Sequence, residues 1–375
     1  NSFITFENVS DNELFSSSIE IFEDLTKPDS DSYEFIYPNL IYEKYVNNDQ
    51  GKFTLSSKFF QKQYDTNRYD GVIINDLIFN SEDSLNNSGF VSNYSIILKN
   101  INTEGKNSNS YKDDTDNKLL TSLILQSEIP MIKKKDSYKG SFTPKVLARL
   151  SPSETKNIKN KDRRIDYFDL FQINRINEDD MIEGGNSLTL GFDYKIKDNE
   201  DIEKINLSIG QVYRLEENND LPDNSSIGNK SSDFIGKFKI QPNQSFDLNH
   251  AFSIDESFND LNYSFTEANI SVNNFITSFK YLDSNYLNTN KSYISNKSKF
   301  LLDRNNSISF GTNKDLDKNL TEYYDLVYEY KNDCLSAAIE YKKSYYKDVD
   351  LSPDESIFFT LKIIPFGNIN TPSIK

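Results

Sequence analysis

Residues 335–342 read Leu-Ser-Ala-Ala-Ile-Glu-Tyr-Lys, and residues 356–363 read Ser-Ile-Phe-Phe-Thr-Leu-Lys-Ile. In both stretches apolar side chains occupy every second position, and mostly small, polar or charged ones lie between them. Side chains with a period of two belong to β-strands, whose successive residues point to opposite faces of a sheet. The two stretches therefore predict an antiparallel hairpin whose two faces meet different surroundings.

The same alternation recurs through the second half of the chain, with polar turn-forming clusters between the strands. Some connections are very short, such as residues 241–243 and 273–274, whereas others are long and acidic. The pattern predicts roughly sixteen to eighteen strands, which is too many for an open antiparallel sheet. We therefore expect an all-β fold, an antiparallel transmembrane β-barrel, with one domain over residues 1–375.

The amino-acid composition narrows the classes of function that this chain could have. The net charge is −16, and no basic stripe is present, which argues against nucleic-acid binding. No apolar run approaches the ~18 residues of a transmembrane helix. A barrel remains compatible with the hydrophobic content of 36%, because barrel strands alternate. The first residue is Asn rather than Met, so we expect the chain to begin inside a longer protein.

Residues with catalytic chemistry are scarce. His250 and Cys334 are the only residues of their types, and His250 lies in phase with apolar neighbours on a strand. None of the acidic clusters has the spacing of a calcium-binding loop. We expect no enzymatic activity, no cofactor and no metal. Cys334 is expected to be a buried thiol, a reactive thiol or half of a bridge to a cysteine outside this chain.

One segment carries a family signature. Residues 169–175 read Asp-Leu-Phe-Gln-Ile-Asn-Arg, and residues 180–185 read Asp-Met-Ile-Glu-Gly-Gly. This segment resembles the signature of the LPS-assembly family LptD, and residues 35–40, 143–146 and 209–214 and the terminal hairpin resemble other parts of it in the same order. The motif residues are Asn174, Arg175, Asp180, Glu183, Gly184 and Gly185.

The chain departs from the family pattern at two positions of this signature. It carries Glu178 and Met181 where the family usually has Gly and Arg. Asp180 and Glu183 are therefore expected to lack that arginine as a partner.

The resemblance implies the C-terminal part of a barrel in the bacterial outer membrane that receives lipopolysaccharide and releases it into the outer leaflet. It implies two protein partners, the plug lipoprotein LptE and the periplasmic bridge protein LptA, the latter through an N-terminal domain that is absent here. It also implies that Cys334 forms a disulfide with that absent domain.

The last strand, residues 356–364, would be one lip of a lateral exit for the lipid, because a closed barrel has no edge and sideways release needs a weak seam. The seam residues are Ile357, Phe359, Leu361, Ile363 and Pro365. Polar faces, with residues such as Asn206, Ser208 and Arg214, are expected to line a hydrated lumen for the glycan and phosphates.

Two alternatives remain open at this point. A different outer-membrane barrel, either a porin or a receptor, would need no covalent tie at Cys334. A soluble or surface β-rich adhesin would bury its aromatic faces under a second sheet.

Overall fold

A computed structural model describes residues 2–27, 31–286, 289–345, 353–363 and 367–370. Their secondary structure is almost entirely antiparallel β-strand, which confirms the predicted fold class. The described residues form 22 strands, more than the sixteen to eighteen predicted. Part of the difference comes from short strands, such as Ser84–Leu85, Met131–Lys135 and Gly367–Asn370, which carry too little alternation to be recognised. No helix in the described residues has the length and apolar character needed to cross a membrane.

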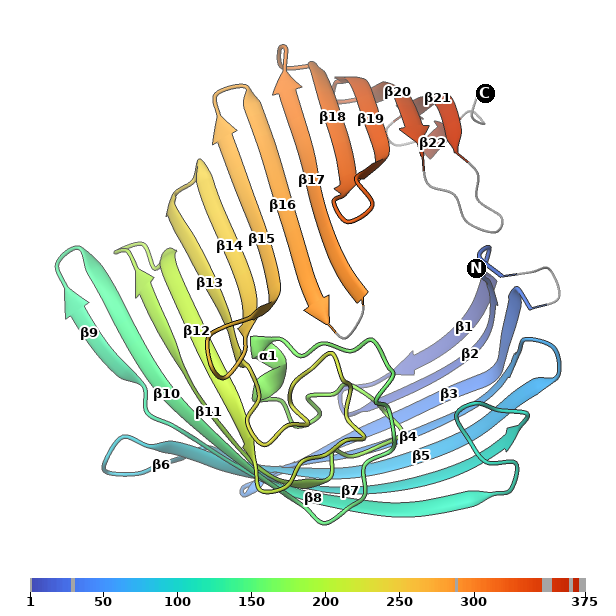
Figure 1. Cartoon of the computed structure of the whole chain (residues 1–375), viewed down its shortest axis with the longest axis vertical. Coiled ribbons are helices and arrows are strands. Elements are labelled where there is room, and N and C mark those ends of the chain that lie inside the picture. Colours follow the sequence, from blue (N-terminus) through green and yellow to red (C-terminus); the bar gives the residue numbers. More distant parts are fainter. Residues whose placement is uncertain (1, 28–30, 287–288, 346–352, 364–366, 371–375) are drawn as a thin grey trace. The chain divides into compact units, whose positions relative to one another are not determined.

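The chain divides into two compact units (Figure 1). Unit 1 comprises Asn1–Met131, Phe142–Phe192 and Gly210–Asp233, and unit 2 comprises Ile132–Ser141, Asp193–Ile209 and Phe234–Lys375. Both are built from strands that follow one another in a meander. The single domain over residues 1–375 stays a prediction.

In unit 1 the strands from β1 to β8, and then β10, are joined in sequence order by antiparallel pairing, except that β5 and β6 both pair with β7. The bounds of the strands that contribute to unit 1 are β1 Ser2–Val9, β2 Glu13–Glu23, β3 Tyr33–Asn48, β4 Gly51–Tyr64, β5 Arg68–Ser81, β6 Ser84–Leu85, β7 Val91–Lys106, β8 Asp116–Glu128, β10 Tyr138–Ser151, β11 Gly185–Lys197 and β12 Glu203–Arg214. The unit boundary passes through β10, β11 and β12.

The strands of unit 2 include β9 and a second antiparallel meander from β13 to β22. Their bounds are β9 Met131–Lys135, β13 Phe234–Asn243, β14 Phe246–Ile254, β15 Leu261–Val272, β16 Phe275–Tyr286, β17 Thr289–Leu301, β18 Asn306–Asp315, β19 Leu320–Lys331, β20 Leu335–Ser344, β21 Asp354–Ile363 and β22 Gly367–Asn370. The predicted terminal hairpin is present as β20 and β21, with Ile339 opposite Phe359.

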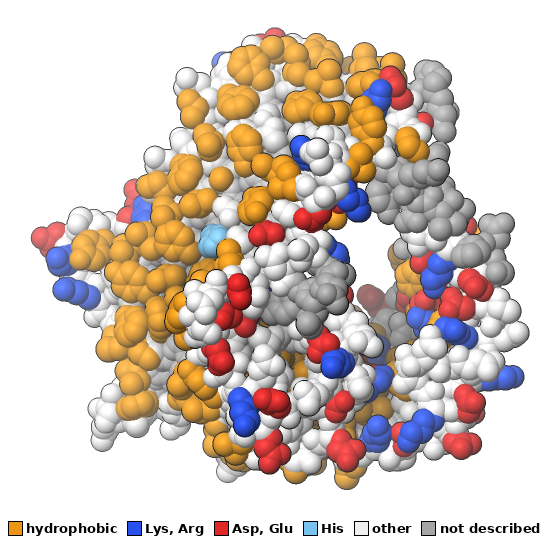
Figure 2. Space-filling model, viewed as in Figure 1, with side chains coloured by type: hydrophobic (Ala, Val, Ile, Leu, Met, Phe, Trp, Pro, Cys, Tyr) orange, Lys and Arg blue, Asp and Glu red, His pale blue; other side chains and the backbone are white. Residues whose placement is uncertain are grey.

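Each unit exposes an apolar face. In unit 1 it carries aromatic and aliphatic side chains that meet across strands, such as Phe79, which lies between Phe53 and Tyr94 with ring centroids 4.7 and 5.7 Å away. In unit 2 the exposed side chains include Phe279, Phe310 and Leu326. Figure 2 shows hydrophobic side chains gathered over the strands from β13 to β18. Since these side chains are exposed in the part of the chain that the structure describes, this face does not have the burial of the inner face of a sandwich.

The opposite face of unit 1 differs from the predicted hydrated lumen. It carries a buried apolar cluster of Val72, Ile74, Ile97, Ile101, Leu120, Ile124, Leu147 and Ile182. Phe171 and Ile173 pack against this cluster from the segment between β10 and β11. We call residues 152–184 the insert. It covers this face and closes a hydrophobic core, which removes the strands beneath it from water.

A second loop, residues 215–233 between β12 and β13, binds the insert. The amide of Ile158 donates to the carbonyl of Asp220 (2.8 Å), and the amide of Asp223 donates to the carbonyl of Lys159 (3.0 Å). The insert contains the one helix of the described residues, α1 (Tyr167–Leu170), which begins at a capping box between Asp166 and Asp169. Figure 1 shows α1 and these two segments over the long strands of unit 1.

Candidate functional site

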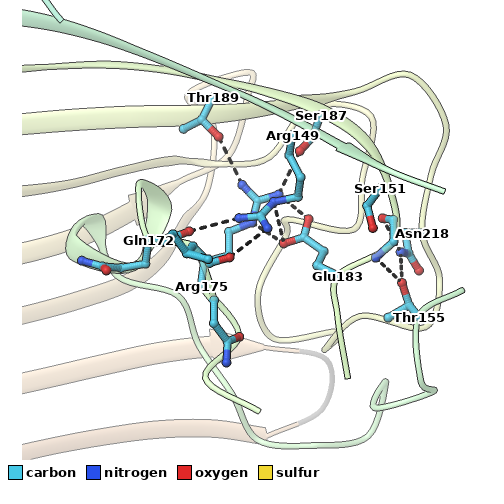
Figure 3. Close-up of polar contacts among 12 residues, drawn as sticks. Arg149, Ser151, Thr155, Gln172, Arg175, Glu183, Ser187, Thr189 and Asn218 are labelled. Atoms are coloured by element: carbon cyan, nitrogen blue, oxygen red, sulfur yellow. Dashed lines mark hydrogen bonds and ion pairs between the residues drawn. The ribbon is translucent and has the colours of Figure 1, made fainter. Parts of the chain in front are cut away.

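A buried cluster of three arginines and one glutamate holds the insert on the sheet (Figure 3). Arg149 comes from β10, Arg175 and Glu183 come from the insert, and Arg214 is the last residue of β12. None of the four is more than 5% exposed. The cluster lies wholly within unit 1.

The central contact joins Arg175 and Glu183 at two points. Arg175 Nε donates to Glu183 Oε2 (2.5 Å), and Arg175 Nη2 donates to Glu183 Oε1. The guanidinium also donates to the hydroxyls of Thr189 and Ser187 on β11, each at 3.2 Å. A planar guanidinium fits a carboxylate in this way, whereas a lysine ammonium would not.

The other two arginines connect the insert to the strands. Arg214 donates from Nη1 to Glu183 Oε1 and from Nη2 to the Gly184 carbonyl, both at 2.8 Å. Arg149 donates from Nη1 to the Ile173 carbonyl (2.9 Å) and from Nη2 to the Gln172 carbonyl (3.0 Å). These contacts fix both ends of residues 172–184.

One carboxylate faces three guanidinium groups. Burial by itself would raise the pKa of Glu183, but the charges of Arg175, Arg149 and Arg214 outweigh burial and lower its pKa to about 2. Glu183 is therefore ionised at neutral pH. The Nε atoms of Arg149 and Arg214 are buried without a hydrogen-bond partner in the described structure, so the cluster depends on this single anion.

The two glycines of the motif have different backbone roles. A Cβ on Gly184 would lie 2.1 Å from the Ser153 carbonyl oxygen, so only glycine fits the close approach of these two backbone segments. Gly185 has φ +83°, a conformation that L residues rarely adopt. Glycine at both positions lets the chain turn from the insert into β11.

Asp180 lies outside the arginine cluster. It forms an ion pair with Lys156 and accepts a hydrogen bond from the hydroxyl of Tyr111 (2.5 Å). Burial alone would raise the pKa of Asp180, but the Lys156 charge, with the hydrogen bonds from Lys156 and Tyr111, lowers it. Asn174 caps a nearby turn, donating to the Glu178 carbonyl (3.0 Å) and accepting from the Asn177 amide (3.0 Å).

Met181 leaves Glu183 without the arginine of the family pattern, but Glu183 pairs with three other arginines. The partners come from residues 149, 175 and 214, and two of these are distant in sequence. Arg214 was expected on a hydrated lumen face together with Asn206 and Ser208, yet all three are buried. Arg149 and Arg214 were missed as site residues because the motif gives no signal for them. An arginine in phase with Leu147 on a strand was the one hint in the sequence.

The terminal hairpin belongs to unit 2. Cys334 is an exposed free thiol in the turn between β19 and β20, where its amide donates to Asn332 Oδ1 (2.9 Å). In this chain it has no second cysteine to pair with, so the disulfide to an absent domain stays a prediction.

The predicted seam residues lie mainly on β21. Ile357, Phe359 and Ile363 are exposed and Leu361 is half-buried, whereas Pro365 lies outside the described residues. β21 pairs with β20 along its length and with β22 at residues 360–363. A role for these residues in lateral release stays a prediction.

Within the described residues, no group of three or more His, Cys, Asp and Glu side chains is arranged to hold a metal ion. The arginine cluster is closed to solvent and presents no nucleophile. Its arrangement serves to position the insert.

An all-β meander with an exposed apolar face, and with long segments that fold onto the opposite face, defines a protein of the outer-membrane barrel class. The chain belongs to the LptD family, because the model of that family, described as LPS transport system D, matches residues 93–347.

Solved structures resemble the chain more distantly. The siderophore receptor PirA from Acinetobacter baumannii is 7% identical, with a TM-score of 0.45 over 96% of this chain and 70% of that one. The ferric enterobactin receptor PfeA from Pseudomonas aeruginosa, in a mutant form, is 7% identical, with a TM-score of 0.44 over 97% and 70%. A mutant Rh. blastica porin is 9% identical, with a TM-score of 0.29 over 81% and 91%. Among curated proteins none matches.

Proposed function

We propose that this chain is the membrane-embedded part of a translocon that inserts lipopolysaccharide into the outer leaflet of the bacterial outer membrane, with no bond chemistry of its own. Membership of the LptD family carries the proposal. The exposed apolar faces of both units support it, because side chains such as Phe79 and Phe310 suit contact with acyl chains.

The polar face of unit 2 has the chemistry to guide a phosphorylated glycan. It carries lysines beside acids, including the pairs Lys280–Glu267 and Lys299–Glu329, both at 3.0 Å. These pairs are partly exposed, so exchange of a carboxylate for a lipid phosphate costs little. In unit 1 the insert covers the corresponding face, so we place the glycan route on unit 2.

The family partners extend the proposal. An N-terminal periplasmic domain would deliver lipopolysaccharide from LptA, and LptE would act as the plug. Cys334 would form a disulfide with that domain, since its thiol is exposed in a three-residue turn and short turns face the periplasm in this class of barrel. β21, with Ile357 and Phe359 exposed, would form one lip of the lateral exit.

A pair of adjacent positions tests the function. Ser309 and Phe310 are neighbours on β18 and point to opposite faces. A photo-crosslinking amino acid at Ser309 is expected to give lipopolysaccharide adducts in growing cells, whereas the same residue at Phe310 gives mainly phospholipid adducts. A porin or receptor would conduct or import solutes without lipopolysaccharide adducts at Ser309, and that result would overturn the proposal.

A further inference from the structure

The apolar face of unit 1 contains a groove of about 580 Å³ near the start of β7. Its floor is made by side chains of β7, β8 and β10, with Tyr94 and Leu125 at its centre and Val146 and Ala148 beside them. The segment around β6 lines it from the other side. All of its lining residues belong to unit 1.

The groove exists because β5 ends before it reaches the start of β7. β5 pairs with β7 only as far as Asn80 opposite Ser95, and β6 then takes the place of β5 by pairing Ser84 with Ser92. Figure 1 labels β6 at the end of the long strands of unit 1. The floor of the groove is also formed by small side chains. These are Ala148 and the pair Ser92 and Ser127, whose hydroxyls hydrogen-bond each other at 2.8 Å.

The position of the groove fixes its depth in a membrane. It lies at the end of unit 1 that has the short turns at residues 10–12 and 49–50. The long segments 107–115, 152–184 and 215–233 lie at the opposite end. Short turns face the periplasm in outer-membrane barrels, so the groove opens to the periplasmic leaflet.

The rim of the groove is polar and carries a carboxylate. Glu82 is exposed and forms no ion pair within the described residues. Gln50 also lines the groove. Gln126 alternates with Leu125 on β8, so its side chain points to the opposite face of the sheet. An apolar floor below a carboxylate and an amide complements a lipid with a primary ammonium group, a phosphate and an acyl chain.

We propose that this groove is a binding site for a glycerophospholipid with an ethanolamine-type headgroup. One acyl chain lies over Tyr94 and Leu125, the ammonium meets Glu82, and the amide of Gln50 donates to the phosphate or ester oxygens. The inference rests on the membrane placement in the proposed function. It adds a lipid of the periplasmic leaflet, distinct from the lipid that is transported.

The absence of tryptophan from the sequence gives a direct test. Tyr94→Trp places a single tryptophan in the groove of the full chain, reconstituted in bilayers that contain a phospholipid with brominated acyl chains. Brominated phosphatidylethanolamine is expected to quench the fluorescence at a mole fraction roughly two- to five-fold lower than brominated phosphatidylglycerol, the factor expected from one exposed ion pair. Glu82→Gln should remove this preference, whereas Asp11→Asn, at the same end, should keep it.

A substitution that fills the groove provides a second test in the same quenching experiment. Ala148→Phe in the Tyr94→Trp background should remove the headgroup preference, and Leu150→Phe, on the same strand and face but outside the groove, should retain it. Equal quenching by the two lipids before any further substitution would overturn the site and leave the membrane placement intact. Absence of quenching by either lipid would overturn the membrane placement and the site together.

Discussion

Arg175 and Glu183 form a buried two-point ion pair eight residues apart on the insert, and Arg149 and Arg214 approach the same carboxylate from two strands. This pair joins the family motif to the sheet of unit 1. The motif is therefore a structural clamp, which explains why its residues include a charged pair and two glycines but no nucleophile.

Removal of the single anion should loosen the insert. Glu183→Gln leaves three buried guanidinium groups without a counter-charge, and loss of one partner of a buried ion pair costs about 3–5 kcal/mol. We expect faster proteolysis of residues 152–184 and a lower unfolding midpoint in urea. Asp179→Asn is the control, because its ion pair with Lys58 is largely exposed on the Asp179 side and should cost less than about 1 kcal/mol. Equal losses in the two variants would contradict the clamp.

Lowering the pH should destabilise the folded protein, because it protonates Glu183. The pKa of Glu183 falls from an ordinary value of 4.5 to about 2 in the folded protein, so the unfolded state binds the proton more tightly. Its contribution, roughly 3 kcal/mol, is fully present above pH 4.5 and is lost as the pH falls towards 2.

Urea unfolding at pH 7, 5.5, 4 and 3 measures this effect. The free energy of unfolding contributed by Glu183 should be constant between pH 7 and 5.5 and decline below 4.5. Asp180, whose pKa is also lowered, adds a decline of the same sign. The difference between wild type and Glu183→Gln isolates Glu183, and a pH-independent difference would contradict the lowered pKa.

Two leucines on β10 lie in different environments. Leu147 is fully buried beneath the insert, whereas Leu150 is 44% exposed on the apolar face. Leu147→Ala should lower the free energy of unfolding by about 2–5 kcal/mol through lost burial and a cavity. Leu150→Ala should have a much smaller effect in detergent. If both substitutions had the same effect, the insert would not form a core.

The turn at Gly184 should not tolerate a side chain. Gly184→Ala puts a methyl group against the Ser153 backbone, and overpacking of this kind costs about 1–3 kcal/mol. Thermal unfolding followed by heat-modifiable gel migration would record the loss. Gly140→Ala on β10 is a matched control, because the nearest atoms to its Cβ lie 3.9 Å away.

Thiol labelling should reveal the orientation in the membrane. In the 375-residue chain, which has no second cysteine, a membrane-impermeant maleimide should react with Cys334 only after the outer membrane is permeabilised, because the thiol lies in a short turn. Asp113→Cys in a Cys334→Ser background, in the long loop 107–115, should react on intact cells. Reaction of Cys334 on intact cells would reverse the predicted orientation.

The alternation of side chains was enough to predict the terminal hairpin and its exposed apolar face. Residues 335–342 and 356–363 pair as expected because a period of two leaves one face apolar and one polar whatever the neighbours are. The motif of residues 169–185 was likewise visible, since its members are close in sequence. The sequence pattern is sufficient to predict a structural feature where the interacting residues are close in sequence.

Only the tertiary structure decided what covers the second face of unit 1 and which groups neutralise Glu183. Arg149 and Arg214 reach that carboxylate from positions 34 and 31 residues away, and nothing in their own sequence surroundings indicates the contact. The face of unit 1 that was predicted to be hydrated is a hydrophobic core, because Phe171 and Ile173 of the insert pack against strands that are distant in sequence. Burial and charge pairing depend on three-dimensional neighbours, which the alternation of a single strand does not specify.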